Sequence, residues 1–80
     1  MKTVKLSNPI TINDVEVKEL TLKEPNVGNL EKAMVHQDNP MALSICLVAQ
    51  ISNHTEADIR KLSMSDMNSI QKEMGDWLNF

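Results

Sequence analysis

The chain has 80 residues, of which 41% are hydrophobic and 24% charged, and its net charge is −3. This length predicts one domain, residues 1–80, and the composition is that of a folded chain and not of a disordered one. The acidic balance, without a basic cluster, argues against nucleic acid as a partner. The most apolar stretch, residues 41–51, is about half as long as a membrane-spanning helix, so we expect no membrane association.

The single cysteine, Cys46, excludes an internal disulfide and is typical of a reducing compartment. The first residues lack the apolar run of a signal peptide, so the sequence predicts a protein of the cytoplasm. Small folds without a disulfide or a metal often gain stability from a partner or from self-association. We therefore expect a protein partner, and a homo-oligomer stays open.

Residues 2–23 alternate between apolar and polar side chains, which is typical of half-buried strands. Asn13 and Asp14 interrupt the alternation. Both residue types tolerate a positive φ, so they suit a two-residue turn between antiparallel strands. The sequence therefore predicts a β-hairpin over residues 1–24.

This hairpin is expected to bend. Pairing outward from the turn places Leu20 and Leu22 opposite polar residues unless the first strand carries one extra residue. One extra residue would pair Leu6 with Leu20 and Val4 with Leu22. We expect it in a bulge at residues 7–9, because proline has no N–H to offer a strand ladder.

Two helix-start signals follow the hairpin. Asn26 is predicted to cap a helix that ends near Gln37. Asn39 and Pro40 then form a second signal, a cap followed by proline at the first helical position. The helix after them, residues 41–52, is apolar almost all round.

The remaining residues predict two more helices. Thr55 is expected to cap a short helix that ends near Leu62, and Ser65 and Asp66 are expected to open the last one. The last helix carries an apolar stripe at helical spacing, formed by Met67, Ile70, Met74, Trp77 and Leu78. A bent hairpin followed by three to four short helices, packed as a small bundle over residues 26–80, is an α+β fold.

The chemistry-bearing residues predict no catalytic, cofactor or metal site. Cys46 lies in an apolar run and is interpreted as a core residue. His36, Cys46 and His54 match no zinc-ligand spacing. The two glycines form no phosphate-binding loop. Three acids of the last helix are expected on its solvated face: Asp66, Glu73 and Asp76. We therefore expect a binding protein and not an enzyme.

Two features predict a surface for a partner. Helix 41–52 is more apolar than a half-buried helix needs, although a central core helix would look the same. Five methionines follow Met1, and methionine recurs on adaptable apolar surfaces as well as in core gaps. The expected contact residues are Met41, Leu43, Leu47, Ile51, Met67, Met74 and Trp77.

Short motifs follow one another along the chain: Leu20–Pro25 (L-T-L-K-E-P), Ile51–Asn53 (I-S-N), Thr55–Leu62 (T-E-A-D-I-R-K-L) and Ser63–Met67 (S-M-S-D-M). In this order, and over nearly the whole chain, the sequence resembles the tail assembly chaperones of contractile-tailed, Mu-like phages and prophages. It departs from them at the hairpin turn, where glycine is commoner, and at Lys23, where arginine is frequent.

The resemblance implies a role in phage tail morphogenesis. Such a protein would bind the tape-measure protein and keep it soluble and extended in the host cytoplasm while tube subunits polymerise. The tail tube protein is a further candidate partner, and the chaperone would not be retained in the mature virion. The alternatives are a small phage-encoded regulatory or adaptor protein that binds another host or phage protein, and a structural tail component.

Overall fold

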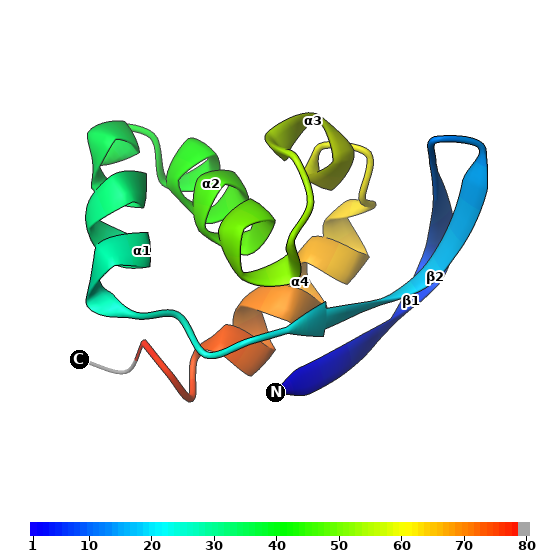
Figure 1. Cartoon of the computed structure of the whole chain (residues 1–80), viewed down its shortest axis with the longest axis horizontal. Coiled ribbons are helices and arrows are strands. Elements are labelled where there is room, and N and C mark those ends of the chain that lie inside the picture. Colours follow the sequence, from blue (N-terminus) through cyan, green and yellow to red (C-terminus); the bar gives the residue numbers. More distant parts are fainter. Residues whose placement is uncertain (79–80) are drawn as a thin grey trace.

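A computed structural model describes residues 1–78 of the chain. An antiparallel β-hairpin is followed by a group of short helices, so the predicted α+β class is confirmed (Figure 1). The tip of the hairpin projects to one side of the molecule, and α1 lies at the opposite side. The elements are β1 (Lys2–Ile12), β2 (Val15–Leu22), α1 (Val27–Ala33), the 3-10 turn η1 (Met34–His36), α2 (Pro40–Ser52), α3 (Glu56–Ile59) and α4 (Met64–Met74).

The hairpin turn forms as its residues predict. Asn13 and Asp14 have φ values of 51° and 63°, in the left-handed region. Two successive residues of this kind give a turn whose twist matches that of the flanking strands. Ile12 and Val15 pair directly across it.

The predicted bulge lies in the predicted place, but it is larger than one residue. Pairing is regular from the turn to Ile10–Val17 and resumes at Lys5–Glu19. Between these pairs β1 has four residues, 6–9, and β2 has one, so the first strand carries three extra residues. The predicted size of the bulge was therefore wrong.

The pairs beyond the bulge differ accordingly from the predicted ones. Val4 lies opposite Leu20, and Lys2 lies opposite Leu22. The predicted pairs Leu6–Leu20 and Val4–Leu22 do not form. One and three are both odd numbers, and side chains alternate along a strand, so either bulge places the apolar residues on the same face.

The size of the bulge is explained by a carboxylate on α4. Asp66 accepts hydrogen bonds from the Ser7 N–H (2.8 Å), the Ser7 hydroxyl (2.7 Å) and the Asn8 N–H (3.0 Å). These two N–H groups therefore donate to α4 and do not pair with the second strand. Asp66 is 2% exposed, so its predicted place on a solvated face was wrong.

Burial raises the pKa of Asp66, but hydrogen bonds outweigh it. Those from Ser7, Asn8 and Ser63 hold the pKa of this carboxyl below its ordinary value. The charged form is thus the one that the fold stabilises, and it fastens the bulge to α4.

Polar caps start the helices. The side chains of Asn26, Asn39 and Thr55 accept N–H groups of the first turns of α1, α2 and α3, as predicted. The cap of α4 is Ser63, which accepts the N–H of Asp66 at 3.2 Å. The predicted start at Ser65 was wrong because Ser63 already provides this bond, and Ser65 lies inside the first turn.

Two helices end earlier than the sequence predicts. The α-helical part of α1 ends at Ala33, and the chain continues as the 3-10 turn to His36, close to the predicted end at Gln37. The regular part of α3 ends at Ile59, short of the predicted Leu62. Bonds between residues three apart carry the chain through both segments, which is the usual way in which a short helix tightens at its end.

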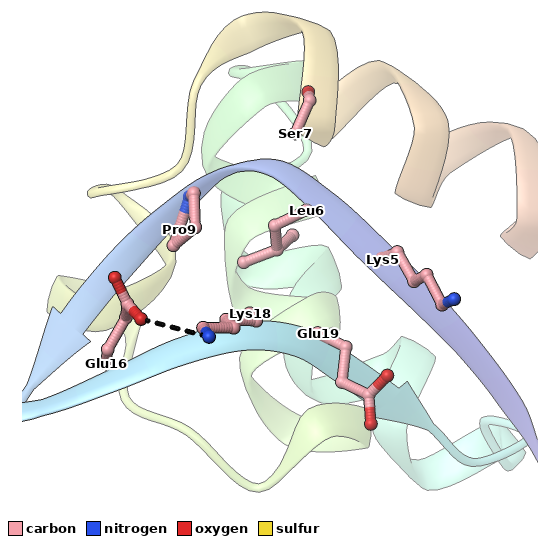
Figure 2. Close-up of a pocket in the computed structure, with 7 residues that line it drawn as sticks. All are labelled: Lys5, Leu6, Ser7, Pro9, Glu16, Lys18 and Glu19. Atoms are coloured by element: carbon pink, nitrogen blue, oxygen red, sulfur yellow. Dashed lines mark ion pairs between the residues drawn. The ribbon is translucent and has the colours of Figure 1, made fainter.

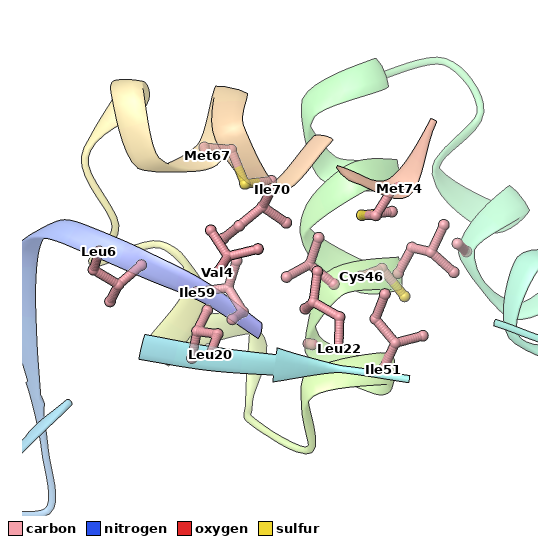
Figure 3. Packing of buried hydrophobic residues seen from close by; sticks show 14 of the residues in the cluster. Val4, Leu6, Leu20, Leu22, Cys46, Ile51, Ile59, Met67, Ile70 and Met74 are labelled. Carbon is pink, nitrogen blue, oxygen red and sulfur yellow. The ribbon is translucent and has the colours of Figure 1, made fainter. Parts of the chain in front are cut away.

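The core lies between the bulged face of the hairpin, α2 and α4 (Figure 3). The second half of α2 is buried, so the interpretation of this helix as a central core element is confirmed for residues 46–52. The N–H of Lys23 donates to the carbonyl of Ile51 (3.1 Å) and joins the end of β2 to α2. The largest fully buried side chains are Leu20, Leu22, Leu47, Val48 and Ile70.

Candidate protein-binding surface

A groove of about 290 Å³ lies between α2 and the end of α4. The first half of α2 is only partly buried, and it forms one wall. The other wall comes from the last turn of α4 and the residues after it. We call this the α2–α4 groove; its lining residues are Leu43, Ser44, Leu47, Gln71, Met74, Gly75 and Leu78.

A second hollow of about 140 Å³ continues from the first towards α1. The two share Leu78, which stands between them. We call the second hollow the Trp77 groove; its lining residues are Pro25, Asn26, Val27, Leu30, Trp77 and Leu78. Both grooves are lined mainly by apolar side chains, so they suit apolar side chains of another molecule.

Exposed apolar side chains occur on α1, on η1 and at the start of α2. Val27 on α1 is 86% exposed and Val35 on η1 is 79% exposed. Met34 and Met41 are exposed as well. Val27 lines the Trp77 groove, and the other three lie on η1 and at the start of α2. Such exposed apolar side chains are available to a partner.

The residues expected from the sequence to contact a partner divide into three groups. Leu43, Leu47 and Met74 line the α2–α4 groove, and Trp77 lines the Trp77 groove. Met41 is exposed beside them.

Ile51 and Met67 are core residues, 2% and 4% exposed, and line neither groove. Leu47 and Met74 are also almost fully buried, so they form the floor of the groove rather than its rim. Only the position of a helix in the fold separates such residues from exposed ones, because helical spacing looks the same for both.

The sequence reasoning missed part of the lining. Pro25, Val27 and Leu30 come from the start of α1, and Ser44, Gln71 and Gly75 were not singled out because they are not apolar stripe residues. Leu78 was recognised as part of the stripe of the last helix, four residues after Met74. The signal that could have found the α1 residues is their apolar spacing beside a conspicuous cap.

Trp77 is held by a cation from the other end of the described chain. The Lys2 ammonium lies 5.1 Å from the centre of the Trp77 ring. It also forms ion pairs with Asp76 and, at 3.4 Å, with Glu73. The hydrogen bond to Asp76 raises the pKa of Lys2, so the cation persists over a wide pH range. Lys2 thus fixes the residues that follow α4 against the first strand.

A larger hollow, about 580 Å³, lies on the bulged hairpin (Figure 2). Its lining includes Lys5 and Lys18 as well as Glu16 and Glu19, so its charges balance. Lys18 and Glu16 form an ion pair at 3.5 Å, and both side chains are exposed. A shallow, charge-balanced hollow offers little to a specific ligand, so the apolar grooves are the better candidate despite their smaller volume.

Cys46, the one candidate nucleophile, is buried in α2. Its sulfur atom accepts a long hydrogen bond (3.7 Å) from the Gln50 amide. His36 and Glu56 lie nearby, so that the fold brings together a set of side chains that the sequence spacing does not reveal. His54 is not part of this set. No helix within residues 1–78 is long and apolar enough to cross a membrane.

An α+β fold with an apolar groove between two helices is suited to contact with another protein. Residues 3–79 match the model of the family described as "Phage tail assembly chaperone proteins, E, or 41 or 14". The chain belongs to this family, and its partners are proteins of tail assembly. No curated protein and no solved structure matches it.

Proposed function

We propose that this chaperone binds the tape-measure protein and keeps it soluble while the tail tube is assembled around it. The observation that carries the proposal is the apolar α2–α4 groove, and the exposed apolar side chains within residues 27–41 support it. The protein acts by binding and not by catalysis. It works in the host cytoplasm and leaves before the virion is complete, and the tail tube protein is a second partner.

Two neighbouring apolar hollows support the binding of an amphipathic helix. Such a helix presents side chains at spacings of three and four residues, and its partner must offer a row of apolar hollows. The α2–α4 groove and the Trp77 groove follow one another through Leu78 and provide two such hollows. A tape-measure protein with long apolar helices would aggregate if these helices stayed uncovered.

Exposed methionines suit a partner of varied sequence. Met34 and Met41 are both exposed, and the methionine side chain is flexible and polarisable. A surface of this kind adapts to successive segments of one long helix instead of selecting one of them. Many copies bound along the same chain would hold it firmly although each single contact is weak, so tube subunits could displace them one by one.

The contact residues are tested by co-expression with the tape-measure protein encoded by the same phage. We expect the wild-type chaperone to raise the soluble fraction of the tape-measure protein several-fold. Leu43→Lys and Ser44→Lys place a charge in the groove and should abolish most of this gain. Met64→Lys, at an exposed apolar position at the start of α4, is the matched control and should behave as wild type.

The Ser44→Lys variant removes no apolar side chain, so it separates loss of binding from loss of folding; circular dichroism checks the fold of all three variants. The proposal is overturned if the wild type gives no gain in solubility. The assignment of the binding surface to the groove is overturned if the groove variants and the control give the same soluble fraction of the tape-measure protein. Immunoblots of purified virions should show no signal from the chaperone.

A further inference from the structure

Three side chains that commonly bind metal ions meet where η1, α2 and α3 converge. A ring nitrogen of His36, the sulfur of Cys46 and a carboxylate oxygen of Glu56 all lie within 4.8 Å of one another. The three residues lie ten positions apart in sequence (36, 46, 56) and come from three different helical segments. Packing of η1 and α3 against α2 is therefore what brings them together.

The ligand types favour zinc. Thiolate, imidazole and carboxylate are the three side-chain ligands of Zn²⁺ in proteins, at about 2.0–2.3 Å from the ion. Tetrahedral ligands at these distances stand about 3.5 Å apart. Binding would thus draw the three atoms together by up to about 1.3 Å. His36 and Glu56 are half-buried and can make this adjustment by small side-chain rotations.

The side chain of Gln50 holds the Cys46 sulfur in a defined orientation. The Gln50 amide donates to the Cys46 sulfur at 3.7 Å and to the Cys46 carbonyl at 3.4 Å, and it is itself held by the Asn29 carbonyl at 3.0 Å. Donors of this kind orient a sulfur ligand towards a metal ion. Cys46 is 7% exposed, so a metal-bound thiolate would be shielded from solvent.

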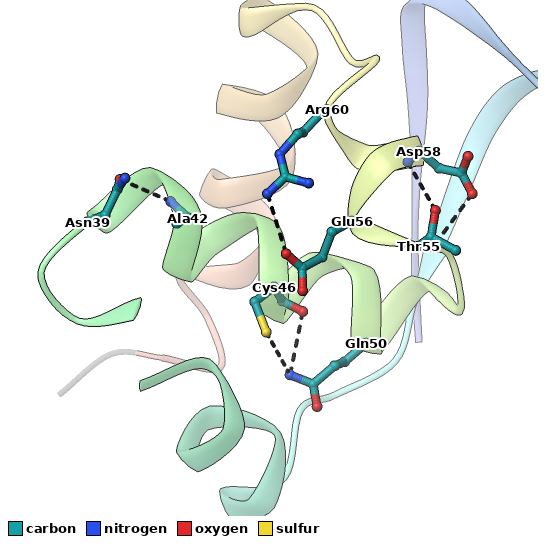
Figure 4. A network of polar contacts seen from close by, with 8 residues as sticks. All are labelled: Asn39, Ala42, Cys46, Gln50, Thr55, Glu56, Asp58 and Arg60. Atoms are coloured by element: carbon teal, nitrogen blue, oxygen red, sulfur yellow. Dashed lines mark hydrogen bonds and ion pairs between the residues drawn. The ribbon is translucent and has the colours of Figure 1, made fainter. Parts of the chain in front are cut away.

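Glu56 has only a weak competing partner. Its carboxylate lies 3.5 Å from the Arg60 guanidinium, and both side chains are substantially exposed. Figure 4 shows the carboxylate with Cys46 on one side and Arg60 on the other. An exposed ion pair of this length contributes little, so the carboxylate is available to a divalent ion. A thiolate and a carboxylate together balance the charge of Zn²⁺.

We propose that His36, Cys46 and Glu56 form a zinc site in which water occupies the fourth position. The ion would join three helical segments of a fold whose one cysteine cannot form an internal disulfide. It would fix the corner between η1 and α2, beside the exposed Met34, Val35 and Met41. The site thus serves stability, and it does not depend on the identity of the protein partner.

The experiment uses the full-length, reduced, metal-free chain at neutral pH. ZnSO₄ is titrated by calorimetry and by thermal unfolding, and CoCl₂ serves as a spectroscopic probe of the ligands. We expect one Zn²⁺ per chain and a rise in Tm of about 10–20 °C when free zinc exceeds its Kd about 100-fold. The Co²⁺ complex should show an intense thiolate-to-metal charge-transfer band, which requires a cysteine ligand.

Single substitutions identify the ligands. His36→Gln and Glu56→Gln change half-buried side chains and should each weaken zinc binding about tenfold or more, without loss of the fold. Cys46→Ser should remove the charge-transfer band. His54→Gln alters the histidine outside the cluster and should bind zinc like the wild type. The proposal is overturned if zinc leaves Tm unchanged, if the cobalt complex lacks the thiolate band, or if His36→Gln and Glu56→Gln bind zinc as tightly as His54→Gln.

Discussion

Apolar side chains are covered to different extents on the hairpin side and on the α1 side of the molecule. On the hairpin side, the core-facing residues Leu20, Leu22 and Ile70 are almost completely covered, and Asp66 closes the contact between the strands and α4. On the α1 side, Val27 and Val35 are largely exposed on α1 and η1. The two sides are built from similar side chains and differ in what covers them.

This difference shows how so short a chain divides its apolar side chains between stability and contact. The hairpin side places them in one shared core with α4 and the second half of α2. The α1 side packs on α2 through few buried residues, since Ala33 is the one that α1 buries fully, and it retains the grooves. The exposed apolar residues of α1 and η1, which are Val27, Met34 and Val35, thus contribute little to folding and are available to a partner.

The strongest test of this comparison removes apolar atoms on each side. Ile70 is 0% exposed, so Ile70→Ala should lower the free energy of unfolding by about 2–5 kcal/mol. Val27→Ala should change it by no more than about 0.5 kcal/mol, because Val27 is already exposed to water. Urea unfolding followed by circular dichroism measures both. A large loss in Val27→Ala would show that α1 belongs to the core after all.

The second test concerns the carboxylate that fastens the bulge. Asp66→Asn leaves buried hydrogen-bond groups imperfectly paired and should cost about 1–3 kcal/mol of unfolding free energy at pH 7. The folded state lowers the pKa of Asp66, so its contribution is present above the unfolded value, about 3.9, and is lost as the pH falls below it.

Stability of the wild type should therefore fall more steeply than that of Asp66→Asn as the pH drops below about 4. Asp38→Asn, an exposed carboxylate in the turn before α2, is the control and should follow the wild-type pH curve. Parallel curves for the wild type and Asp66→Asn would contradict the role of the charged form.

The smallest effect is expected where the two sides meet, at Lys2 and Trp77. Lys2→Met keeps the apolar stem of the side chain and removes the cation. The free energy of unfolding should therefore fall less than in Asp66→Asn, while the emission spectrum of Trp77 should change clearly. The folded pKa of Lys2 is raised, so its contribution is present below the ordinary lysine value, about 10.4, and is lost at higher pH. An unchanged emission spectrum would show that Lys2 does not position the ring.

Local features of the fold could be predicted from the sequence because the residues that create them are neighbours. Asn13-Asp14 sets the turn, and Asn39-Pro40 sets the start of α2, with partners no more than three residues away. The bulge could be located through Pro9, but its size could not be derived. It depends on Asp66, whose partners lie 58 and 59 positions away.

The same distinction explains the candidate surface. The periodic stripe of the last helix identified Met74 and Trp77, and the strongly apolar composition of helix 41–52 identified Leu43 and Leu47. Neither signal shows how much of a helix face is covered. They could not show that Ile51 lies in the core, since the amount of a face that neighbours cover depends on the angle and distance between helices. The cluster of His36 with Cys46 escaped prediction for the same reason.

The bond between Ser7 and Asp66 also affects how the protein is made. It links residues 59 positions apart, so a loop of most of the chain must close before the bond forms. During synthesis the ribosome releases the hairpin long before α4. The hairpin therefore stays without its contacts to α4 until the last helix has emerged, and we expect the final packing to form only then.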